Sequence, residues 1–336
     1  MRIRGDRRQF LGAVASGGAA LLLGCGKSER AADRSDTPGR TKVRLALNWF
    51  PEPEHGGFYA ALLAGDFAAE GLDVEIVPGG PGIQVIPQLV RGAVEFGLAS
   101  ADQVLVQRGQ EADVVTLFAP LQSNPRCILV HAASGITNFD QLRDVTLAIG
   151  AGQPFVRYLE KHAPLEGVRM VPYTGRLASF LADPKSAQQG FVFSEPVFAE
   201  REGVSVNVLK LSELGFDPYA SCVVTTRRLL DERPEIAASF VRACRRGWER
   251  YLDDSSAVDP ELIRLNRELD AEGLRAAHES LRPLCQPPDG RPLGSMTAER
   301  WNRLRDQLAD LEFIDRAMSA DEAWIEPIDE SGDKLE

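Results

Sequence analysis

The sequence predicts a two-lobed α/β protein in which mixed or parallel sheets are flanked by helices and the chain crosses between the lobes twice. Three observations predict this layout. Short apolar runs alternate with helical patterns between residues 43 and 225, as in βαβ units. After Thr226 only helical patterns follow. The 336 residues suffice for two core-bearing lobes at about 100–200 residues per domain.

The predicted elements follow from these patterns in chain order. The strands are Val43–Asn48, Asp73–Val77, Phe96–Ala99, Val114–Ala119, Cys127–His131, Thr146–Ile149, Val168–Pro172, Gly190–Phe193, Val204–Leu209 and Ala220–Thr225. The helices are Gly57–Ala64, Pro81–Arg91, Ala101–Arg108, Phe155–His162, Leu177–Ala182, Pro196–Glu202, Arg227–Glu232, Pro234–Asp253, Pro260–Leu269, Ala271–Arg282 and Thr297–Leu311. Pro234 is a clear helix start, because proline is favoured in a first helical turn.

The element order also predicts how the chain is divided. Lobe one is expected to comprise residues 42–128 and 223–325, and lobe two residues 129–222. Residues 326–336 are expected to form an acidic tail. Ligands of open α/β sheets bind beyond the carboxyl ends of the strands. We therefore expect a ligand in the cleft between the lobes, held by the loops that follow those strands.

Composition excludes several classes of partner. A net charge of -11 argues against nucleic acid and against a basic membrane-binding patch. Beyond Cys25, four cysteines remain, Cys127, Cys222, Cys244 and Cys285, and they form no C-x-x-C pair. We therefore expect no metal, no redox site and no cofactor. Buried free thiols are the favoured interpretation of these cysteines, although an oxidising compartment leaves a disulfide open. The protein is expected to be a monomer.

The first 25 residues have the order of an export signal. Basic residues including Arg7 and Arg8 precede an apolar stretch, which is shorter than the about 20 residues of a membrane-spanning helix. The segment Arg7–Leu11 resembles a twin-arginine signature, and a general secretory signal stays possible. Leu22–Cys25 resembles a bacterial lipobox, which implies lipidation of Cys25. Residues 26–41 are polar and predict a flexible tether.

These features predict an exported protein that is lipid-anchored on the outer side of the cytoplasmic membrane or in the periplasm. They do not determine which membrane holds the anchor.

The loop after the first predicted strand has an unusual composition. Asn48–His55 (NWFPEPEH) follows the first predicted strand and carries a Trp and a His between stiffening prolines, which indicates a functional loop. The alternative is that Trp49 packs across the seam between the lobes and that His55 binds local backbone.

The sequence resembles the periplasmic binding proteins related to the thiamine pyrimidine-precursor synthase, within the sulfonate, nitrate and pyrimidine branch. The resemblance extends over about residues 42–320. It is carried by the segments Leu45–His55, Gly65–Val77, Leu89–Gln103, Gln189–Gly203 and Glu213–Leu230. It implies a type-II periplasmic binding protein whose lobes close on a ligand by hinge motion, with an ABC permease and ATPase as partners.

The resemblance also implies a set of ligand-binding residues. Lobe one would contribute Asn48, Trp49, His55, Ser100 and Gln103; lobe two and the crossing would contribute Gly152, Gln153, Phe155, Phe193, Glu195 and Tyr219. A flat aminopyrimidine could stack on Trp49, with Phe155, Phe193 or Tyr219 as a second face. Glu195 could accept from an exocyclic amine or instead cap the helix that starts at Pro196.

The main hypothesis is a non-enzymatic solute-binding lipoprotein with a thiamine pyrimidine precursor as ligand. Sulfonate, riboflavin or nitrate are alternative solutes. A second hypothesis is the pyrimidine phosphate synthase itself. Its cysteine-rich run has no counterpart at Tyr219–Cys222, where one thiol is present, and the export signal also disfavours it. A third is an exported sensory or scaffold protein with the same fold.

Overall fold

The computed structural model describes residues 39–287 and 290–325. The predicted export signal with Arg7 and Arg8, the lipidation site Cys25, most of the tether and the acidic tail lie outside the described residues. Within the described part, no helix combines the length and apolar character needed to cross a bilayer.

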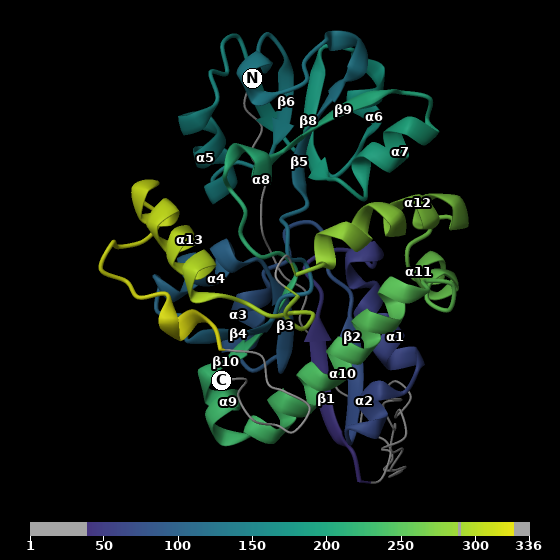
Figure 1. Cartoon of the computed structure of the whole chain (residues 1–336), viewed down its shortest axis with the longest axis vertical. Coiled ribbons are helices and arrows are strands. Elements are labelled where there is room, and N and C mark those ends of the chain that lie inside the picture. The colour runs from purple at the N-terminus through teal and green to yellow at the C-terminus, as the bar shows by residue number, and fades with distance from the viewer. Residues whose placement is uncertain (1–38, 288–289, 326–336) are drawn as a thin grey trace, which may run out of the picture. The chain divides into compact units, whose positions relative to one another are not determined.

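Two five-stranded sheets form the frame of the protein (Figure 1). The first has the order β2-β1-β3-β10-β4 and the second the order β7-β6-β8-β5-β9. In each sheet the first three strands of this order are parallel to one another. The fourth strand, β10 in the first sheet and β5 in the second, runs antiparallel to both of its neighbours. The strands are β1 (Thr41–Ala46), β2 (Leu72–Val77), β3 (Phe96–Ala99), β4 (Val114–Phe118), β5 (Arg126–His131), β6 (Thr146–Ile149), β7 (Arg169–Pro172), β8 (Ser186–Phe191), β9 (Val206–Lys210) and β10 (Cys222–Thr226).

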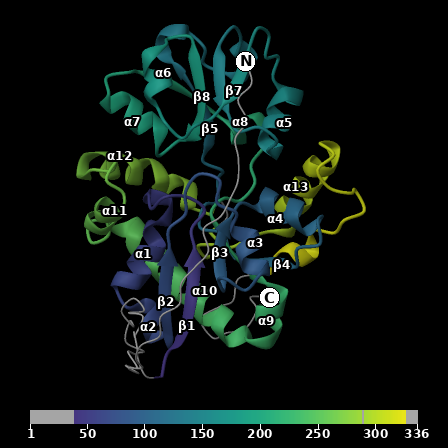
Figure 2. The same ribbon diagram turned by 180° about the vertical axis from the view of Figure 1, so that it is seen from behind.

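Helices cover both sheets (Figures 1 and 2). The α-helices are α1 (Gly56–Leu63), α2 (Asp66–Ala69), α3 (Val85–Val90), α4 (Ala101–Arg108), α5 (Pro154–His162), α6 (Ala178–Ala182), α7 (Glu195–Arg201), α8 (Leu211–Leu214), α9 (Arg227–Glu232), α10 (Pro234–Asp253), α11 (Asp259–Leu265), α12 (Ala271–Leu281) and α13 (Ala298–Asp310). The 3-10 turns are η1 (Pro53–His55), η2 (Ala132–Ser134), η3 (Phe139–Gln141), η4 (Arg282–Cys285) and η5 (Asp321–Ala323).

Strand β5 shows how the sequence builds these layers. Successive side chains of a strand point to opposite faces of the sheet. Ile128 and Val130 accordingly join the apolar cluster that contains Phe155 of α5. Cys127 and Leu129 instead join a cluster with residues of α6 and α7. A strand with apolar residues on both faces must be covered on both faces, and helices do so here.

The predicted two-lobed α/β layout is confirmed, with differences at a few elements. Strand β8 covers Ser186–Phe191 rather than Gly190–Phe193. Its central residues Gln188 and Gln189 are polar but buried, so hydropathy alone placed the strand too late. The short helices α2 and α8 were not predicted. Strand β5 begins at Arg126 and pairs within the second sheet, so the first crossing precedes the boundary expected at residue 128.

The two crossings between the sheets are joined to each other. Asn124 lies in the first crossing, and its backbone N–H donates to Asp217 Oδ1 in the second crossing at 2.7 Å. Its side-chain amide donates to the Pro218 carbonyl at 2.8 Å. Arg300 of α13 adds to both: it donates to the Gln122 carbonyl and forms an ion pair with Asp217 at 3.0 Å. The crossings therefore form one hydrogen-bonded hinge.

All four cysteines of the described chain are buried and free, as expected. Burial raises the pKa of the Cys127 and Cys244 thiols well above their ordinary value, which keeps them protonated and unreactive.

Helices α1 and α10 pack at close range because glycines lie in their contact. A Cβ at Gly57 would lie 2.2 Å from the ring of Trp248, and a Cβ at Gly247 would lie 2.3 Å from the carbonyl oxygen of Gly57. Real Cβ atoms do not come so close, so only glycine permits this helix separation. The contact fixes α1, which follows the Asn48–His55 loop directly.

We expect Gly247→Ala to lower the free energy of unfolding by about 1–3 kcal/mol, because overpacking against backbone outweighs the better helix propensity of alanine. Urea denaturation measures the change. Glu249→Ala, at an exposed position of the same helix, is the control and should change stability by less than about 0.5 kcal/mol. Equal stability of the two variants would contradict the close helix contact.

Candidate ligand-binding site

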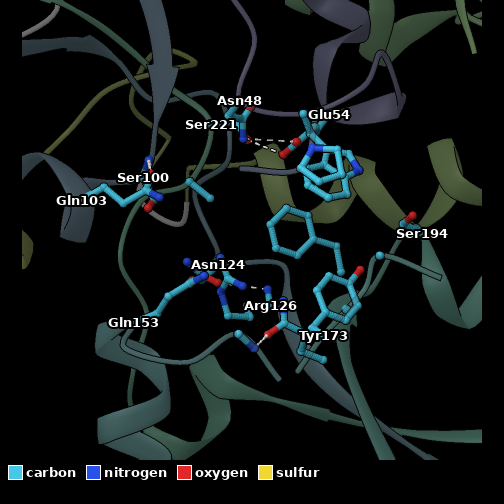
Figure 3. Close-up of a pocket in the computed structure, with 18 of the residues that line it drawn as sticks. Asn48, Glu54, Ser100, Gln103, Asn124, Arg126, Gln153, Tyr173, Ser194 and Ser221 are labelled. Carbon is cyan, nitrogen blue, oxygen red and sulfur yellow. Dashed lines mark hydrogen bonds between the residues drawn. The ribbon is translucent and has the colours of Figure 1, made fainter. Parts of the chain in front are cut away.

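A cavity of about 520 Å³ lies between the two sheets, within the range of small-molecule pockets (Figure 3). Loops that follow the carboxyl ends of parallel strands supply much of its wall, as α/β architecture dictates. Ser100 follows β3, Gly150 follows β6 and Tyr173 follows β7. Asn48 lies two residues beyond β1, and Ser194 lies beyond β8.

Both lobes and the hinge contribute side chains to the cavity. The lining residues are Asn48, Trp49, Glu52, Glu54, Gly80, Pro81, Gly82, Ile83, Ser100, Asp102, Gln103, Asn124, Arg126, Gly150, Gln153, Tyr173, Thr174, Gly175, Gln189, Gly190, Phe191, Ser194, Glu195, Phe216, Pro218, Ala220 and Ser221.

A buried hydrogen-bond chain sets the first lobe's wall. The Glu52 backbone N–H donates to His55 Nδ1 at 3.2 Å, which leaves the proton of a neutral imidazole on Nε2. That nitrogen lies 3.0 Å from Asn48 Oδ1 and donates to it. The Asn48 amide then donates to Glu54 Oε1 at 3.4 Å, and the Ser221 hydroxyl donates to Glu54 Oε2. Asn48, Glu54 and Ser221 lie together on one side of the cavity (Figure 3).

His55 is therefore a positioning residue that orients Asn48 and Glu54. It is 0% exposed and does not line the cavity. Burial lowers its pKa to about 3, so it stays neutral. His55 accepts a hydrogen bond from the Glu52 backbone N–H, as expected from the alternative that His55 binds local backbone.

The second lobe's wall is built around Glu195. The Tyr173 hydroxyl donates to Glu195 Oε1 at 2.7 Å, and the Phe191 backbone N–H donates to Oε2 at 2.7 Å. Both carboxyl oxygens thus hold a protein donor and each keeps accepting capacity toward the cavity. Ser194, not Glu195, occupies the N-cap position of α7, and Glu195 is the first helical residue.

Acidic side chains outnumber basic ones in the cavity. Among the residues that the structure describes, Glu52, Glu54, Asp102 and Glu195 line it together with one cation, Arg126. Burial raises the pKa of Glu52 well above its ordinary value, and the nearby Glu54 and Glu195 raise it further. Burial also raises the pKa of Glu195, and that of Glu54 to about 7, against the opposing effect of its Ser221 and Asn48 donors. A carboxyl with a raised pKa tends to keep its proton, and a ligand that donates a hydrogen bond or carries a positive charge would favour its ionised form.

Arg126 begins β5, and its guanidinium lies over two aromatic rings. The distance to the ring centroid is 4.2 Å for Phe155 and 5.2 Å for Phe191. Phe155 is 1% exposed and supports Arg126 from behind rather than lining the cavity. Figure 3 shows Arg126 with Asn124 and Gln153 on the side opposite Asn48 and Glu54.

Trp49 reaches from lobe one to lobe two. Gly175 has a φ of +74°, and a Cβ there would lie 3.3 Å from the Trp49 ring. Trp49 thus lines the cavity and also packs across the seam between the lobes, so both interpretations of this side chain describe part of its position.

Polar groups at two turns complete the wall. Ser100 is the N-cap residue of α4, and its backbone N–H donates to Gln103 Oε1 at 3.1 Å, so this donor is already used. In lobe two the Gly150 N–H donates to Gln189 Oε1 at 2.7 Å. Gln153 lines the cavity beside them.

The structure brings six of the eleven expected ligand-binding residues to the cavity: Asn48, Trp49, Ser100, Gln103, Gln153 and Glu195. The other five do not line it. These are His55, Gly152, Phe155, Phe193 and Tyr219.

Besides His55 and Phe155, which are described above, three expected residues do not line the cavity, and each has a different environment. Gly152 is exposed in a turn, and its neighbour Gly150 faces the cavity instead. Phe193 is 0% exposed in the core beside the first sheet. The Tyr219 hydroxyl accepts a hydrogen bond from the Thr297 N–H at 3.1 Å, and its ring lies under Arg300 in the hinge.

Several polar residues of the cavity wall were not predicted from the sequence, among them Glu52, Glu54, Arg126, Tyr173 and Ser221. Two of them carried a usable signal. Glu52 and Glu54 are in the same loop as Trp49, and an acid between prolines in a functional loop could have been included. Ser221 has a φ of +50°, which is rare for a residue other than glycine and is visible only in the structure.

The described residues contain no group of three or more His, Cys, Asp or Glu side chains suited to hold a metal ion.

Known proteins resemble this chain in sequence and in structure. The sequence model of the family described as NMT1/THI5 like matches residues 52–257, more than half of the chain. The formylaminopyrimidine-binding protein of Halalkalibacterium halodurans is 24% identical over 310 residues, which covers 86% of this chain and 91% of that protein. The riboflavin-binding protein RibY of Chloroflexus aurantiacus is 26% identical over 221 residues, 62% of each protein.

A solved structure supports the fold. The periplasmic aliphatic sulphonate-binding protein SsuA of Escherichia coli matches with a TM-score of 0.66 at 15% identity, covering 88% of this chain and 95% of that chain. The expected periplasmic binding protein fold is therefore confirmed.

The raised pKa of Glu54 has a consequence for stability. Between its ordinary value of 4.5 and about 7, the folded protein holds a proton that the unfolded chain has released, so this group makes stability fall as pH rises through that window. We expect Glu54→Gln to gain about 1–3 kcal/mol relative to the wild type between pH 4.5 and 7.5.

Urea denaturation at both pH values measures this gain. Glu249→Gln, at an exposed site, should differ from the wild type by the same amount at both pH values. A Glu54→Gln difference that does not change with pH would show that Glu54 titrates normally in the folded protein.

Proposed function

The chain belongs to the NMT1/THI5-like family, and from this premise we propose that it is the solute-binding component of an ABC importer, with an aminopyrimidine precursor of thiamine as its ligand. The observation that carries the proposal is the interlobe cavity lined by buried carboxyls and aromatic rings. An ABC permease and ATPase are the partners proposed with it.

The cavity chemistry suits a flat heterocycle with an exocyclic amine. Glu195 or Glu54 can accept from the amine, and a charge-assisted bond of this kind is about twice as strong as a neutral one. Trp49, Tyr173 and Phe191 offer ring faces on the cavity wall. A ring stacked on one of them would gain about 0.5–1.5 kcal/mol beyond burial.

Anionic solutes fit the same wall poorly. A sulfonate or nitrate would be desolvated beside Glu52, Glu54, Asp102 and Glu195, and Arg126 is the single compensating cation among the described lining residues. Riboflavin carries donors and acceptors and is the stronger alternative solute, since a relative of this chain is named for binding it.

The pyrimidine phosphate synthase remains the alternative from a different class, and two observations disfavour it. Among the described residues that line the cavity there is no lysine, whose amine would form a Schiff base with a pyridoxal cofactor. His55 is fully buried behind Asn48 and Glu54 and so is not presented to a ligand.

The decisive test is a thermal-shift screen of the chain without its first 24 residues against an aminopyrimidine, riboflavin, an alkanesulfonate and nitrate. We expect the aminopyrimidine alone to raise the melting temperature, because a ligand that binds only the folded state stabilises it. A shift with the sulfonate and none with the pyrimidine would overturn the ligand assignment. An imine absorbance band on addition of pyridoxal phosphate would instead favour the synthase.

We expect Trp49→Ala to weaken aminopyrimidine binding by about tenfold or more, because the variant loses a ring face on the cavity wall. Isothermal titration calorimetry measures the Kd. Phe50→Ala is the matched control, since Phe50 is the neighbouring aromatic residue, is 46% exposed and does not line the cavity. Equal binding by the two variants would contradict a role for Trp49 in ligand contact.

We also propose that Cys25 is lipidated and holds the protein at the membrane on the exported side. Labelled fatty acid should be incorporated into the wild-type chain in cells and not into Cys25→Ser, because the thiol is the site of attachment. Ser28→Ala, three residues further on, should incorporate label normally. Label in Cys25→Ser would disprove the anchor.

A further inference from the structure

Helices α7 and α12 join the two lobes on the flank opposite α13 (Figures 1 and 2). Helix α7 follows β8 of the second sheet, and α12 belongs to lobe one. Helix α12 leads into η4, where the Leu284 carbonyl accepts hydrogen bonds from the Gln122 and Ser123 N–H groups of the first crossing. The opposite end of α12 begins at Ala271, about 16 Å away along the helix at 1.5 Å per residue. Rotation about the hinge would therefore displace this end most.

An ion pair joins the two helices at that end. Arg201, the last residue of α7, donates to Oδ2 of Asp270, the N-cap residue of α12. Asp270 Oδ1 accepts from the Glu272 and Gly273 N–H groups at 3.1 and 2.9 Å. One carboxyl oxygen thus caps α12 while the other pairs with lobe two. The Gly273 N–H and Arg201 hold the pKa of Asp270 below its ordinary value, so the carboxylate stays ionised at neutral pH.

Apolar side chains pack across the same contact. Phe193, in the loop between β8 and α7, is fully buried in the core cluster that contains Leu274 and Ala277 of α12. Phe198 of α7 packs against that cluster. The void left between the two helices is about 10 Å³, close to the smallest that holds one water molecule. Separating the helices would expose this apolar surface to water, which is unfavourable.

Helix α7 also carries part of the cavity wall. Glu195 is its first residue and lines the cavity, and Arg201 is its last. A single hydrogen-bonded helix of seven residues moves as a unit, so a shift of one end displaces the other. The contact of Arg201 with α12 therefore sets where Glu195 stands relative to the wall of lobe one.

We propose that Arg201 and Asp270 are positioning residues of the ligand site, because their pair latches α7 of lobe two to α12 of lobe one and favours the closed arrangement of the lobes. Neither residue lines the cavity, so the pair acts on the ligand only through closure. The expected effect on ligand affinity rests on the proposed binding function. The expected effect on lobe arrangement does not.

Distance measurements between two spin labels test the latch without ligand. The labels are attached to cysteines that replace Lys185 of lobe two and Glu249 of lobe one, both exposed, in the chain without its first 25 residues. The four cysteines of the described chain are buried, so they compete little for label. We expect Asp270→Asn and Arg201→Gln each to raise the ratio of the longer to the shorter distance about twofold to fivefold, as loss of one partly exposed ion pair should. Asparagine keeps the N-cap, so α12 stays capped.

Calorimetric titration with the aminopyrimidine of the thermal-shift screen measures the effect on binding. The Kd should rise about twofold to fivefold in each variant. The double variant should show no more than the effect of one substitution, since both remove the same pair. Sodium chloride at 1 M should reduce the difference from the wild type, because salt screens a partly exposed pair. A loss that was merely structural would persist in salt.

Glu261→Gln is the matched control. It removes an ion pair with Arg264 that lies within α11 of lobe one, and it should change neither the label distances nor the Kd. Thermal melts establish that each variant is folded before measurement.

The outcomes separate the latch from the proposed function. An unchanged distance distribution in ligand-free Asp270→Asn would overturn the latch, whatever the protein binds. Longer distances with an unchanged Kd would overturn the role of the pair in ligand binding. If the folded wild type does not bind the aminopyrimidine, the proposed ligand is wrong, and the label distances still decide whether the latch exists.

Discussion

The hinge is the constraint on which the rest of the structure depends, because the cavity exists only where the loops beyond the strand ends of the two sheets are held opposite each other. Asn124 binds the second crossing through Asp217 and Pro218. Arg300 joins both crossings to α13 and stacks on Tyr219 at 4.0 Å. Asn124 also lines the cavity and accepts a hydrogen bond from the Arg126 backbone N–H. This one residue therefore connects the hinge to the cavity wall.

The buried carboxyls of the cavity wall limit which ligand groups the cavity can accept. Each ionised acid in a desolvated wall costs free energy unless a donor compensates it. The protein supplies part of the compensation itself, through Tyr173 for Glu195 and through Ser221 and Asn48 for Glu54. A ligand with amine hydrogens supplies the remainder. The same burial that raises the pKa of Glu54 and Glu195 makes their ionised forms depend on a donor or a positive charge from the ligand.

Most of the fold could be predicted from the sequence, because apolar runs and helix periodicity are local signals. Helices α9 and α10 match their predicted bounds, Arg227–Glu232 and Pro234–Asp253. Strand β8 was misplaced because Gln188 and Gln189 are buried by tertiary packing, which hydropathy does not register. The site was harder to predict. Motif resemblance identified the loop with Asn48 and Trp49, but whether His55 faces the cavity or orients its neighbours depends on side-chain direction.

The interruption of lobe one by lobe two has a consequence for how the chain acquires its structure. The second sheet uses one continuous segment, from β5 to β9, and is complete at Lys210. The first sheet needs β10, whose residues pair with β3 and β4 across more than 100 positions of sequence. Short-range pairing forms faster than long-range pairing. During synthesis or refolding, lobe two is thus positioned to form first, with completion of lobe one and of the ligand-binding wall as the later event.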